Sequence, residues 1–411
     1  MIVISDPDAA VRNLAAIIGQ SRLDERLKEF ERQEGQLQPN SVYAQWWFAP
    51  QNALWLTLRG ARQCWNVGQS INRVIDQVPP IGISAALLVA KVYPTMPQWR
   101  QAKFVADLVS SEQLQSVLLE LEAAADLIDL GYDIEWLDDR GREGKRSAEF
   151  VASRAGYRLG VECKASAIDS GRLLHRKYAC QLADDLLNPL SQARGLTGDI
   201  QIIFHDAAPK SLQARASVAQ RILDAVDAQK LEENSPGFLV KHTLRERDGT
   251  AIDLQNYSAA QRTIEADYFR SFTVIAARLE SNKPCDPIVF RFGSSRQDRI
   301  MRAVKENLRT ATEQVGALDC PGFITCFVPE IPDFDGEETR PFVNELAEWF
   351  FGNPQRSHVL AIRLVSDFKV DDLGAVNFAQ APFAMIKNPA RIDEAEHAFA
   401  SPPVQPRAAT L

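Results

Sequence analysis

The sequence predicts an α/β fold, because segments with the period of a helix alternate with segments that have the period of a strand. Residues 112–130 repeat apolar side chains at helical spacing and end at Gly131, a common helix stop. Three alternating segments follow, residues 132–137, 147–153 and 157–164. A helix followed by three strands is therefore the expected centre of the fold.

The third strand places a carboxylate beside an ammonium group. Successive side chains of a strand point to opposite faces, so Glu162 and Lys164 share one face and Cys163 lies on the other. In the preceding strand Glu149 alternates with apolar neighbours, which predicts a second carboxylate on the same face of the hairpin. Two carboxylates and a lysine are the parts of a magnesium site, because Mg²⁺ prefers hard oxygen ligands.

The predicted helix supplies a third carboxylate. At about 100° per residue, Glu120 shares a side of the helix with apolar residues, whereas Glu122 shares its side with Asp126 and Asp129. We therefore expect Glu120 to face the fold and Glu122 to face water.

An acidic residue two positions before a lysine occurs three times in the chain, so context has to select among these pairs. The pair at residues 143–145 lies in a charged, glycine-punctuated stretch that predicts a solvated turn. The pair at residues 367–369 follows an apolar strand, but no matching strand offers a second carboxylate. Glu162 and Lys164 are the selected pair.

After Lys164 the sequence predicts a helix over residues 172–190 and an apolar strand over residues 200–204. The expected order becomes helix, three strands, helix, strand, and we place this core at residues 109–210. Gln181, on the second helix, is a weaker candidate to point at the site.

In this order of elements and in four residues, the chain resembles the PD-(D/E)xK nuclease superfamily, whose restriction-endonuclease-like fold has an α-β-β-β-α-β core. Glu120 matches the family's first acidic residue. Glu149 stands in the second motif, where it replaces the commoner aspartate, as Ala148 replaces proline. Glu162 and Lys164 match the third motif. The resemblance covers roughly residues 113–206.

The resemblance implies a metal-dependent endonuclease that hydrolyses DNA phosphodiesters with Mg²⁺ or, as a substitute, Mn²⁺, in defence against foreign DNA or in repair. Glu149 and Glu162 would hold the ion, and Glu120 would bind it directly or through water. Lys164 would orient a water molecule or stabilise charge on the phosphate. Without the ion the carboxylates should repel one another, so at least one carboxyl pKa should rise and cation binding should stabilise the fold.

Two alternatives to catalysis stay open. In one, Glu162 and Lys164 form a surface ion pair worth about 0–1 kcal/mol, and Glu120 and Glu149 are ordinary rim charges. In the other, a degenerate nuclease-fold module binds nucleic acid or a partner protein without cleavage. DNA is the expected partner, and a homodimer or a separate partner subunit is left open.

Charge is distributed unevenly along the chain. The formal charge of −8 argues against general nucleic-acid affinity, yet residues 138–178 hold ten basic and six acidic side chains. A predicted helix at residues 296–315 also has a basic face, which either follows a phosphate backbone or is simply solvated. The candidate nucleic-acid-binding residues are Arg172, Arg176, Lys177, Arg299, Arg302, Lys305 and Arg309.

The composition, 45% hydrophobic and 24% charged over 411 residues, is that of a soluble globular protein with two or three domains. No apolar run reaches the roughly 18 residues that span a bilayer, and the amino terminus has no signal-peptide pattern. Six cysteines without a close pair predict free thiols in a reducing cytoplasm. We expect a cytoplasmic protein without membrane contact.

Four segments are expected. Residues 1–108 read as a mostly helical domain, and residues 109–210 as the nuclease-like core. Residues 211–390 alternate strands with helices and either extend the core sheet or form a second α/β lobe. Residues 391–411 read as a disordered tail. Trp46 and Trp47 are interpreted as core residues rather than as a platform for nucleobases.

Overall fold

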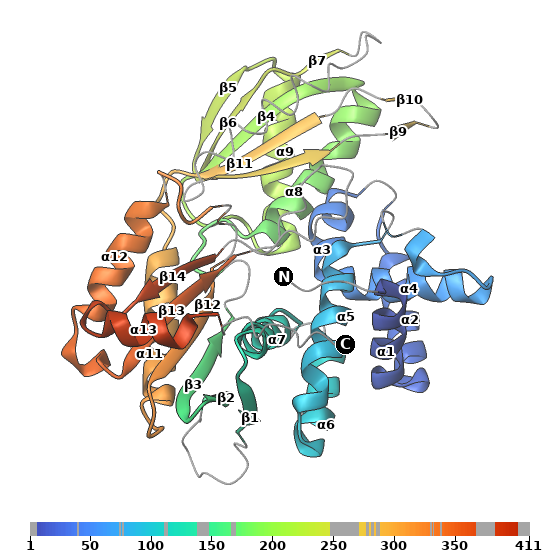
Figure 1. Cartoon of the computed structure of the whole chain (residues 1–411). Helices are drawn as coiled ribbons and strands as arrows, with labels where there is room; N and C mark the ends of the chain where they lie inside the picture. Colours follow the sequence, from blue (N-terminus) through green and yellow to red (C-terminus); the bar gives the residue numbers. More distant parts are fainter. Residues whose placement is uncertain are drawn as a thin grey trace. The chain divides into compact units, whose positions relative to one another are not determined.

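The structure, a computed structural model, describes residues 6–38, 41–73, 75, 78–110, 114–137, 148–165, 170–246, 271–276, 279–280, 283–284, 288–328, 331, 333–337, 339–366 and 383–401. The chain forms two compact units (Figure 1). The first unit is built from Met1–Leu27, Leu54–Ile168 and Met301–Leu411, and the second from Lys28–Ala53 and Asp169–Ile300. The boundaries expected at residues 108, 210 and 390 do not coincide with these units, because each unit joins segments that are far apart in the sequence.

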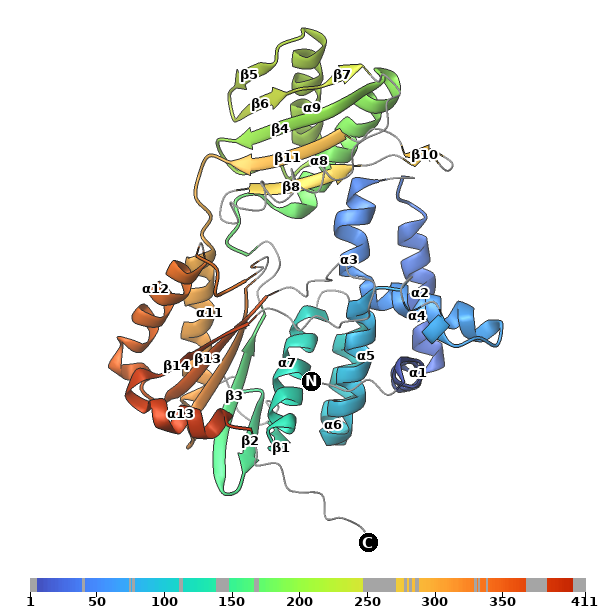
Figure 2. The ribbon, with the colours of Figure 1, turned by 45° about the horizontal axis from the view of Figure 1, so that its top comes forward.

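The first unit contains a mixed six-stranded sheet, which confirms the α/β class (Figure 2). Its strands, in spatial order, are β1 (Asp133–Trp136), β2 (Phe150–Arg154), β3 (Tyr157–Lys164), β12 (Gly322–Phe327), β13 (Val359–Val365) and β14 (Phe383–Lys387). β1, β2 and β3 are antiparallel, as expected for three strands joined by short connections. β12 is parallel to both β3 and β13, and β14 is antiparallel to β13.

The helix and strand expected to complete the core lie elsewhere. They are α8 (Arg176–Asn188) and β4 (Leu196–Phe204), and β4 belongs to the sheet of the second unit. β12 is the parallel neighbour of β3, preceded by α11 (Ile300–Val315). Every residue of β12 is buried, as a strand covered on both faces requires, whereas β4 exposes Gln201. The prediction that residues 172–190 and 200–204 complete the core is therefore wrong.

The strands predicted towards the carboxyl end divide between the two sheets. Those at residues 323–328 and 359–365 are β12 and β13 and extend the sheet of β3. Those at residues 272–279 and 287–292 correspond to β8 (Ser271–Ala276) and β11 (Ile288–Ser294) in the second unit. Extension of the first sheet and formation of a second α/β lobe, posed as alternatives, both occur.

α7 (Leu114–Asp129) is the helix predicted before the three strands, and it ends two residues before Gly131, the glycine that the sequence marked as its stop. Gly131 has φ +80°, a left-handed conformation that glycine adopts without a Cβ clash. The Gly131 amide donates to the Ile128 carbonyl, and the Tyr132 amide donates to the Leu127 carbonyl, both at 2.9 Å. This is a Schellman cap, which satisfies two terminal carbonyls and directs the chain into β1.

α7 is covered on two sides. It contacts β3 and β12 on one side and α5 and α6 on the other. Its buried residues include a run of small ones, Ala123, Ala124 and Ala125, which lets neighbouring elements approach closely. The helices before α7 are α1 (Pro7–Ile18), α2 (Gln20–Glu34), α3 (Ala49–Gln51), α4 (Ala53–Asn66), α5 (Pro80–Val92) and α6 (Gln98–Val109).

The opposite face of the sheet is covered by α11, and α12 (Arg340–Phe351) packs beside α11 (Figures 1 and 2). Gly160 on β3 faces this layer. A Cβ at Gly160 would lie 2.6 Å from Leu318 Cδ1, so a side chain at that position would displace the segment that follows α11. α7 and α11 thus lie on opposite faces of β3.

The segment expected to be a disordered tail begins with a helix. α13 (Ile392–Phe399) buries Ala395 and Ala398, so the prediction is wrong for residues 391–401, and residues 402–411 lie outside the described part. Arg154 on β2 anchors this helix. Its guanidinium donates to the carbonyls of Leu130, His397, Ala398 and Ala400 at 2.6 to 3.2 Å. These bonds supply donors to carbonyls at the end of α13 and to the Leu130 carbonyl just after α7, and so tie the two helix ends together.

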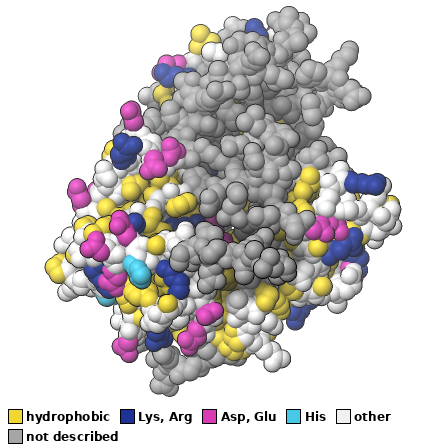
Figure 3. Space-filling view, in the orientation of Figure 1, with side chains coloured by type: hydrophobic (Ala, Val, Ile, Leu, Met, Phe, Trp, Pro, Cys, Tyr) yellow, Lys and Arg dark blue, Asp and Glu magenta, His cyan; other side chains and the backbone are white. Residues whose placement is uncertain are grey.

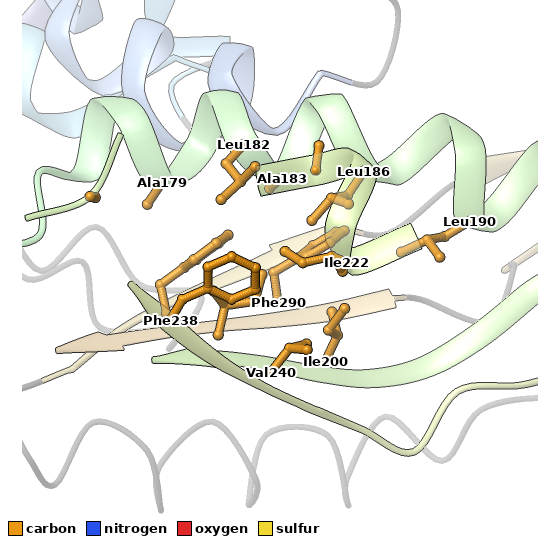
Figure 4. Packing of buried hydrophobic residues seen from close by; sticks show 14 of the residues in the cluster. Ala179, Leu182, Ala183, Leu186, Leu190, Ile200, Ile222, Phe238, Val240 and Phe290 are labelled. Atoms are coloured by element: carbon orange, nitrogen blue, oxygen red, sulfur yellow. The ribbon is translucent and has the colours of Figure 1, made fainter. Parts of the chain in front are cut away.

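The second unit has its own sheet and core. The sheet order is β5 (Glu232–Ser235), β6 (Phe238–His242), β4, β11 and β8, and β7 (Arg245–Glu246) pairs with β4. β9 (Leu279–Glu280) and β10 (Lys283–Pro284) form a separate pair. α8 and α9 (Leu212–Asp227) supply side chains such as Leu182, Leu186 and Ile222, which pack against Phe238 and Phe290 of the strands (Figure 4).

Asp184 ties the segment that holds Trp46 and Trp47 to α8. Its carboxylate accepts hydrogen bonds from the Ser41 hydroxyl, the Val42 amide and the Tyr43 amide at 2.6 to 3.2 Å. Both tryptophans are partly buried and pack against the core of the second unit, which agrees with their interpretation as core residues.

Two further expectations concern cysteines and membrane contact. Cys64, Cys163, Cys180, Cys320 and Cys326 are free thiols, as predicted, and Cys285 lies outside the described residues. Among the helices that the structure describes, none is both long enough and apolar enough to cross a bilayer.

Replacement of Arg154 tests the anchoring of α13. We expect Arg154→Ala to lower the free energy of unfolding in urea by about 1.5–3 kcal/mol, the range for hydrogen bonds that involve a charged group. Arg158→Ala, an exposed arginine on the adjacent strand, is the matched control and should change stability by less than about 0.5 kcal/mol. Equal losses in the two variants would contradict the anchoring role.

Candidate functional site

Glu162 and Lys164 form a close pair beneath α11. Lys164 Nζ lies 2.5 Å from Glu162 Oε1 and 2.5 Å from Gln314 Oε1 of α11. The Glu162 side chain is fully buried and that of Lys164 is 17% exposed. The alternative in which these two residues form a surface ion pair is therefore wrong, because Glu162 has no exposed side-chain surface. A buried pair of this kind needs good geometry to offset the free energy lost when both charges leave water.

Gln314 is a site residue that the sequence did not reveal. It lies on the helix interpreted as a basic face for a phosphate backbone, and it is 7% exposed. Gln181, the glutamine that the sequence offered, lies on α8 in the second unit, whereas Glu162 and Lys164 lie in the first. The sequence does show Gln314 as a polar residue beside the apolar stripe of this helix. That pattern points to the site only once β12, the strand after the helix, is known to pair with β3.

Glu149 is placed by a bulge at the start of β2. Val161 is the register partner of Phe150, and the Glu149 amide also donates to the Val161 carbonyl, at 2.9 Å. Two successive residues thus oppose one, which is the pairing of a β-bulge and re-aims the side chain. Glu149 Oε2 lies 4.0 Å from Nη2 of Arg100 on α6, on the α7 side of the sheet. The expectation that Glu149 shares the face of Glu162 is therefore wrong.

Arg100 also pairs with Glu120. Its Nη2 donates to Glu120 Oε2, so one nitrogen lies near two carboxylates. The Arg100 side chain is 5% exposed, and its guanidinium lies 5.1 Å from the centroid of the Trp136 ring. Glu120 faces the fold, as predicted, with 13% of its side chain exposed.

Glu122 does not face water. It accepts a hydrogen bond from Arg363 of β13 at 3.2 Å, and Asp126 lies 2.5 Å from the same guanidinium. The prediction failed because it assumed that the charged side of α7 is solvated, whereas Glu122 on this side lies against Arg363 of β13, a strand of the sheet. Glu122 therefore needs a buried cation, which Arg363 provides, and the half-exposed Asp126 adds a second carboxylate to that guanidinium.

Burial, and second the negative charge of Glu149, raise the pKa of Glu120 from 4.5 to about 8. The positive charges of Arg100 and Lys103 act in the opposite direction. The prediction that at least one carboxyl pKa rises is confirmed, with burial as the larger cause. Burial also raises the pKa of the Cys163 thiol, and the charges of Glu120, Glu149 and Glu162 add to this rise. Cys163 thus feels the charge of all three carboxylates, although Glu162 lies on the other face of β3.

The donor chemistry suits a hard cation, because Glu120, Glu149 and Glu162 supply carboxylate oxygens. Their present arrangement is different from a formed metal site. Within the described ranges, no three histidine, cysteine, aspartate or glutamate side chains are grouped to hold an ion. Arg100 and Lys164 lie at the oxygens that a metal would use.

The predicted nucleic-acid contacts of the second unit fall into two groups. Arg172 is buried and pairs with Asp298 at 3.0 Å. It therefore stabilises the fold and does not lie on the phosphate-binding surface that the sequence predicted. Arg176 and Lys177 occupy the first turn of α8, and Arg299 is exposed.

The predicted contacts on α11 have acidic neighbours. Lys305 lies 2.8 Å from Glu345 of α12, and Arg309 lies 2.5 Å from Glu306, while Arg302 is exposed. The view in Figure 3 shows basic and acidic side chains interspersed over the region of α11, α12 and α13. The basic face of α11 is thus partly neutralised by its acidic neighbours.

The two other pairs with an acidic residue two positions before a lysine, at residues 143–145 and 367–369, lie outside the described residues.

The raised pKa of Glu120 predicts a stability that falls as pH rises. The folded protein holds this proton from the ordinary value of 4.5 up to about 8, whereas the unfolded chain releases it near 4.5. Ionisation therefore favours unfolding across this window. In EDTA, we expect Glu120→Gln to lose less unfolding free energy than the unmodified protein between pH 5 and pH 8.

Urea unfolding at the two pH values measures this difference. Glu135→Gln removes an exposed carboxyl from β1 and is the matched control, which should follow the unmodified protein. The interpretation of Glu120 fails if all three proteins change equally with pH.

Comparison of the chain with models of protein families, with curated proteins and with solved structures found no match. The chemistry of the site therefore has to be inferred from its side chains and from the order of its strands.

Proposed function

We propose that this protein is a metal-dependent deoxyribonuclease with a restriction-endonuclease-like core. The observation that carries the proposal is the Glu162–Lys164 pair on β3, held by Gln314 of the helix that leads into the parallel strand β12. α7, β1, β2, β3, α11 and β12 follow the order α-β-β-β-α-β, with the segment Asp169–Ile300 of the second unit between β3 and α11. Glu149 and Glu120 lie on the other face of β3, near Arg100.

Lys164 is the residue suited to the phosphate. An ammonium group has three N–H donors; one donates to Gln314 Oε1, and Glu162 Oε1 lies 2.5 Å from the nitrogen. A donor that Gln314 does not use can serve a phosphate oxygen or the attacking water, so the positive charge would lie where negative charge develops. Glu162 and Gln314 hold this ammonium in place before substrate arrives, which removes the need to reorganise it during the reaction.

Glu149 and Glu120, which both lie near Arg100 on the α7 side of the sheet, would hold the cation, and Glu162, on the other face of β3, would act by holding Lys164. A bound Mg²⁺ supplies polarisation of the scissile phosphate and a water of lowered pKa. Glu149, with 27% of its side chain exposed, is the carboxylate of the three most open to solvent, so it is the point at which a cation can enter.

A catalytically degenerate module is the second candidate, because Arg100 already neutralises part of the carboxylate group. In that case the protein binds nucleic acid or a partner through the same fold, without cleavage. Association that needs no metal and survives loss of the Glu162–Lys164 pair would favour this candidate.

Plasmid cleavage tests the proposal. Supercoiled and linear DNA are incubated with Mg²⁺, Mn²⁺ or EDTA, and we expect nicking that requires the metal. Lys164→Ala alone would leave Glu162 as a buried charge without its cation, which costs about 3–5 kcal/mol. The better variant is therefore Glu162→Gln with Lys164→Met, which keeps size and removes both charges.

The double variant should melt near the temperature of the unmodified protein and cleave nothing. Cleavage that persists in this variant would remove the assignment of the active site. Absence of cleavage by the unmodified protein in any metal would favour the degenerate module.

Gln314 is expected to position Lys164 rather than to touch the substrate. Gln314→Leu should lower kcat by about 10–100-fold, the range for partners that orient an active-site group, and leave KM nearly unchanged. Thr312→Val, on the same helix and with its hydroxyl on the Leu308 carbonyl, is the control. A rise in KM with unchanged kcat would contradict the positioning role.

A further inference from the structure

Arg100 occupies an unusual position for a buried arginine. A single nitrogen, Nη2, donates to Glu120 and lies 4.0 Å from Glu149. The Nε atom is buried and has no hydrogen-bond partner among the residues that the structure describes. Arginine holds a carboxylate best with two parallel N–H bonds, so this contact uses half of its capacity.

The carboxylates near Arg100 are the ones that a divalent cation would need. Glu120 and Glu149 both approach the same nitrogen of Arg100, so a positive charge stands beside two neighbouring carboxylates. A guanidinium carries one such charge and a divalent cation carries two. Both bind the same oxygen atoms, so they cannot occupy the site together.

We propose that Arg100 is an internal competitor of the divalent cation at this site. The proposal rests on the proposed metal-dependent function and adds to it the residue that sets cation affinity. In the metal-free protein Arg100 holds Glu120 and Glu149 together. When the cation binds, the guanidinium leaves these carboxylates and keeps its contact with the Trp136 ring, which lies 5.1 Å away.

This competition accounts for two observations. Glu120 and Glu149 lie near each other without forming a grouped metal site among the described residues, because Arg100 directs both of them to itself. The contact is also made by one nitrogen, so it can be exchanged more readily than a two-bond fork. Lys164 differs, since its partner Glu162 is fully buried and Gln314 holds it as well.

Titration of the full-length protein with Mn²⁺ alone, followed by calorimetry, tests the proposal. Linked equilibria of this kind change affinity by about 5–150-fold, so Arg100→Gln should bind Mn²⁺ at least about fivefold more tightly. Lys103→Gln is the matched control. It removes an exposed positive charge from the same helix that also acts on Glu120, but it makes no contact there, so its affinity should change less than about twofold.

Thermal melting in EDTA and in Mn²⁺ is the second measurement, and it covers the case in which Arg100→Gln folds poorly without metal. The variant should melt lower than the unmodified protein in EDTA, and Mn²⁺ should raise its melting temperature by more. An Arg100→Gln protein that binds Mn²⁺ with unchanged or weaker affinity, or that gains no more from Mn²⁺ in the melt, overturns the proposal.

Glu149→Gln separates this result from the proposed function. If the unmodified protein binds Mn²⁺ and Glu149→Gln does not, the metal site stands whatever Arg100→Gln does. If neither the unmodified protein nor Arg100→Gln binds Mn²⁺, both the metal site and the competition are rejected.

Discussion

The burial of α7 between the sheet and the amino-terminal helices is the constraint on which the rest of the first unit depends. A carboxylate that packs into this layer loses most of its hydration, so a cation at a fixed position stabilises it. Arg363 lies beside Glu122 and the more exposed Asp126, and Arg100 lies beside Glu120. These pairings link α7 to β13 and to α6, and they place Glu120 beside the start of β2.

The insertion of the second unit leaves this arrangement intact because its two ends meet. The Leu173 amide and Arg172 both donate to Asp298, and the Arg299 amide donates to the Gly171 carbonyl. The segment Asp169–Ile300 of the second unit therefore begins and ends at adjacent points. β3 and α11 can then pack together in the first unit although a complete second sheet separates them in the sequence.

Local periodicity was enough to predict α7, the three strands and the Glu162–Lys164 pair, because each depends on neighbouring residues. It could not predict that β12 rather than β4 pairs with β3, since both are apolar segments and pairing depends on which faces are covered. Nor could it predict the bulge that turns Glu149, which shifts one residue of a regular alternation. Arg100 and Gln314 were missed for the same reason, because they reach the site through the packing of α6 and α11.

The two cations of the site are unequal, and this inequality determines what the site can do. Lys164 is paired with a carboxylate that has no exposed surface, so removing it would leave a buried charge without a counterion. Arg100 is paired with Glu120 and Glu149, whose side chains are 13% and 27% exposed, so water can hydrate these carboxylates in part if the guanidinium moves away. In the proposed reaction, a cation that arrives from solvent would meet Glu149 first and would displace Arg100 rather than Lys164. The ammonium would stay in place for the phosphate, and the guanidinium would be the group that moves.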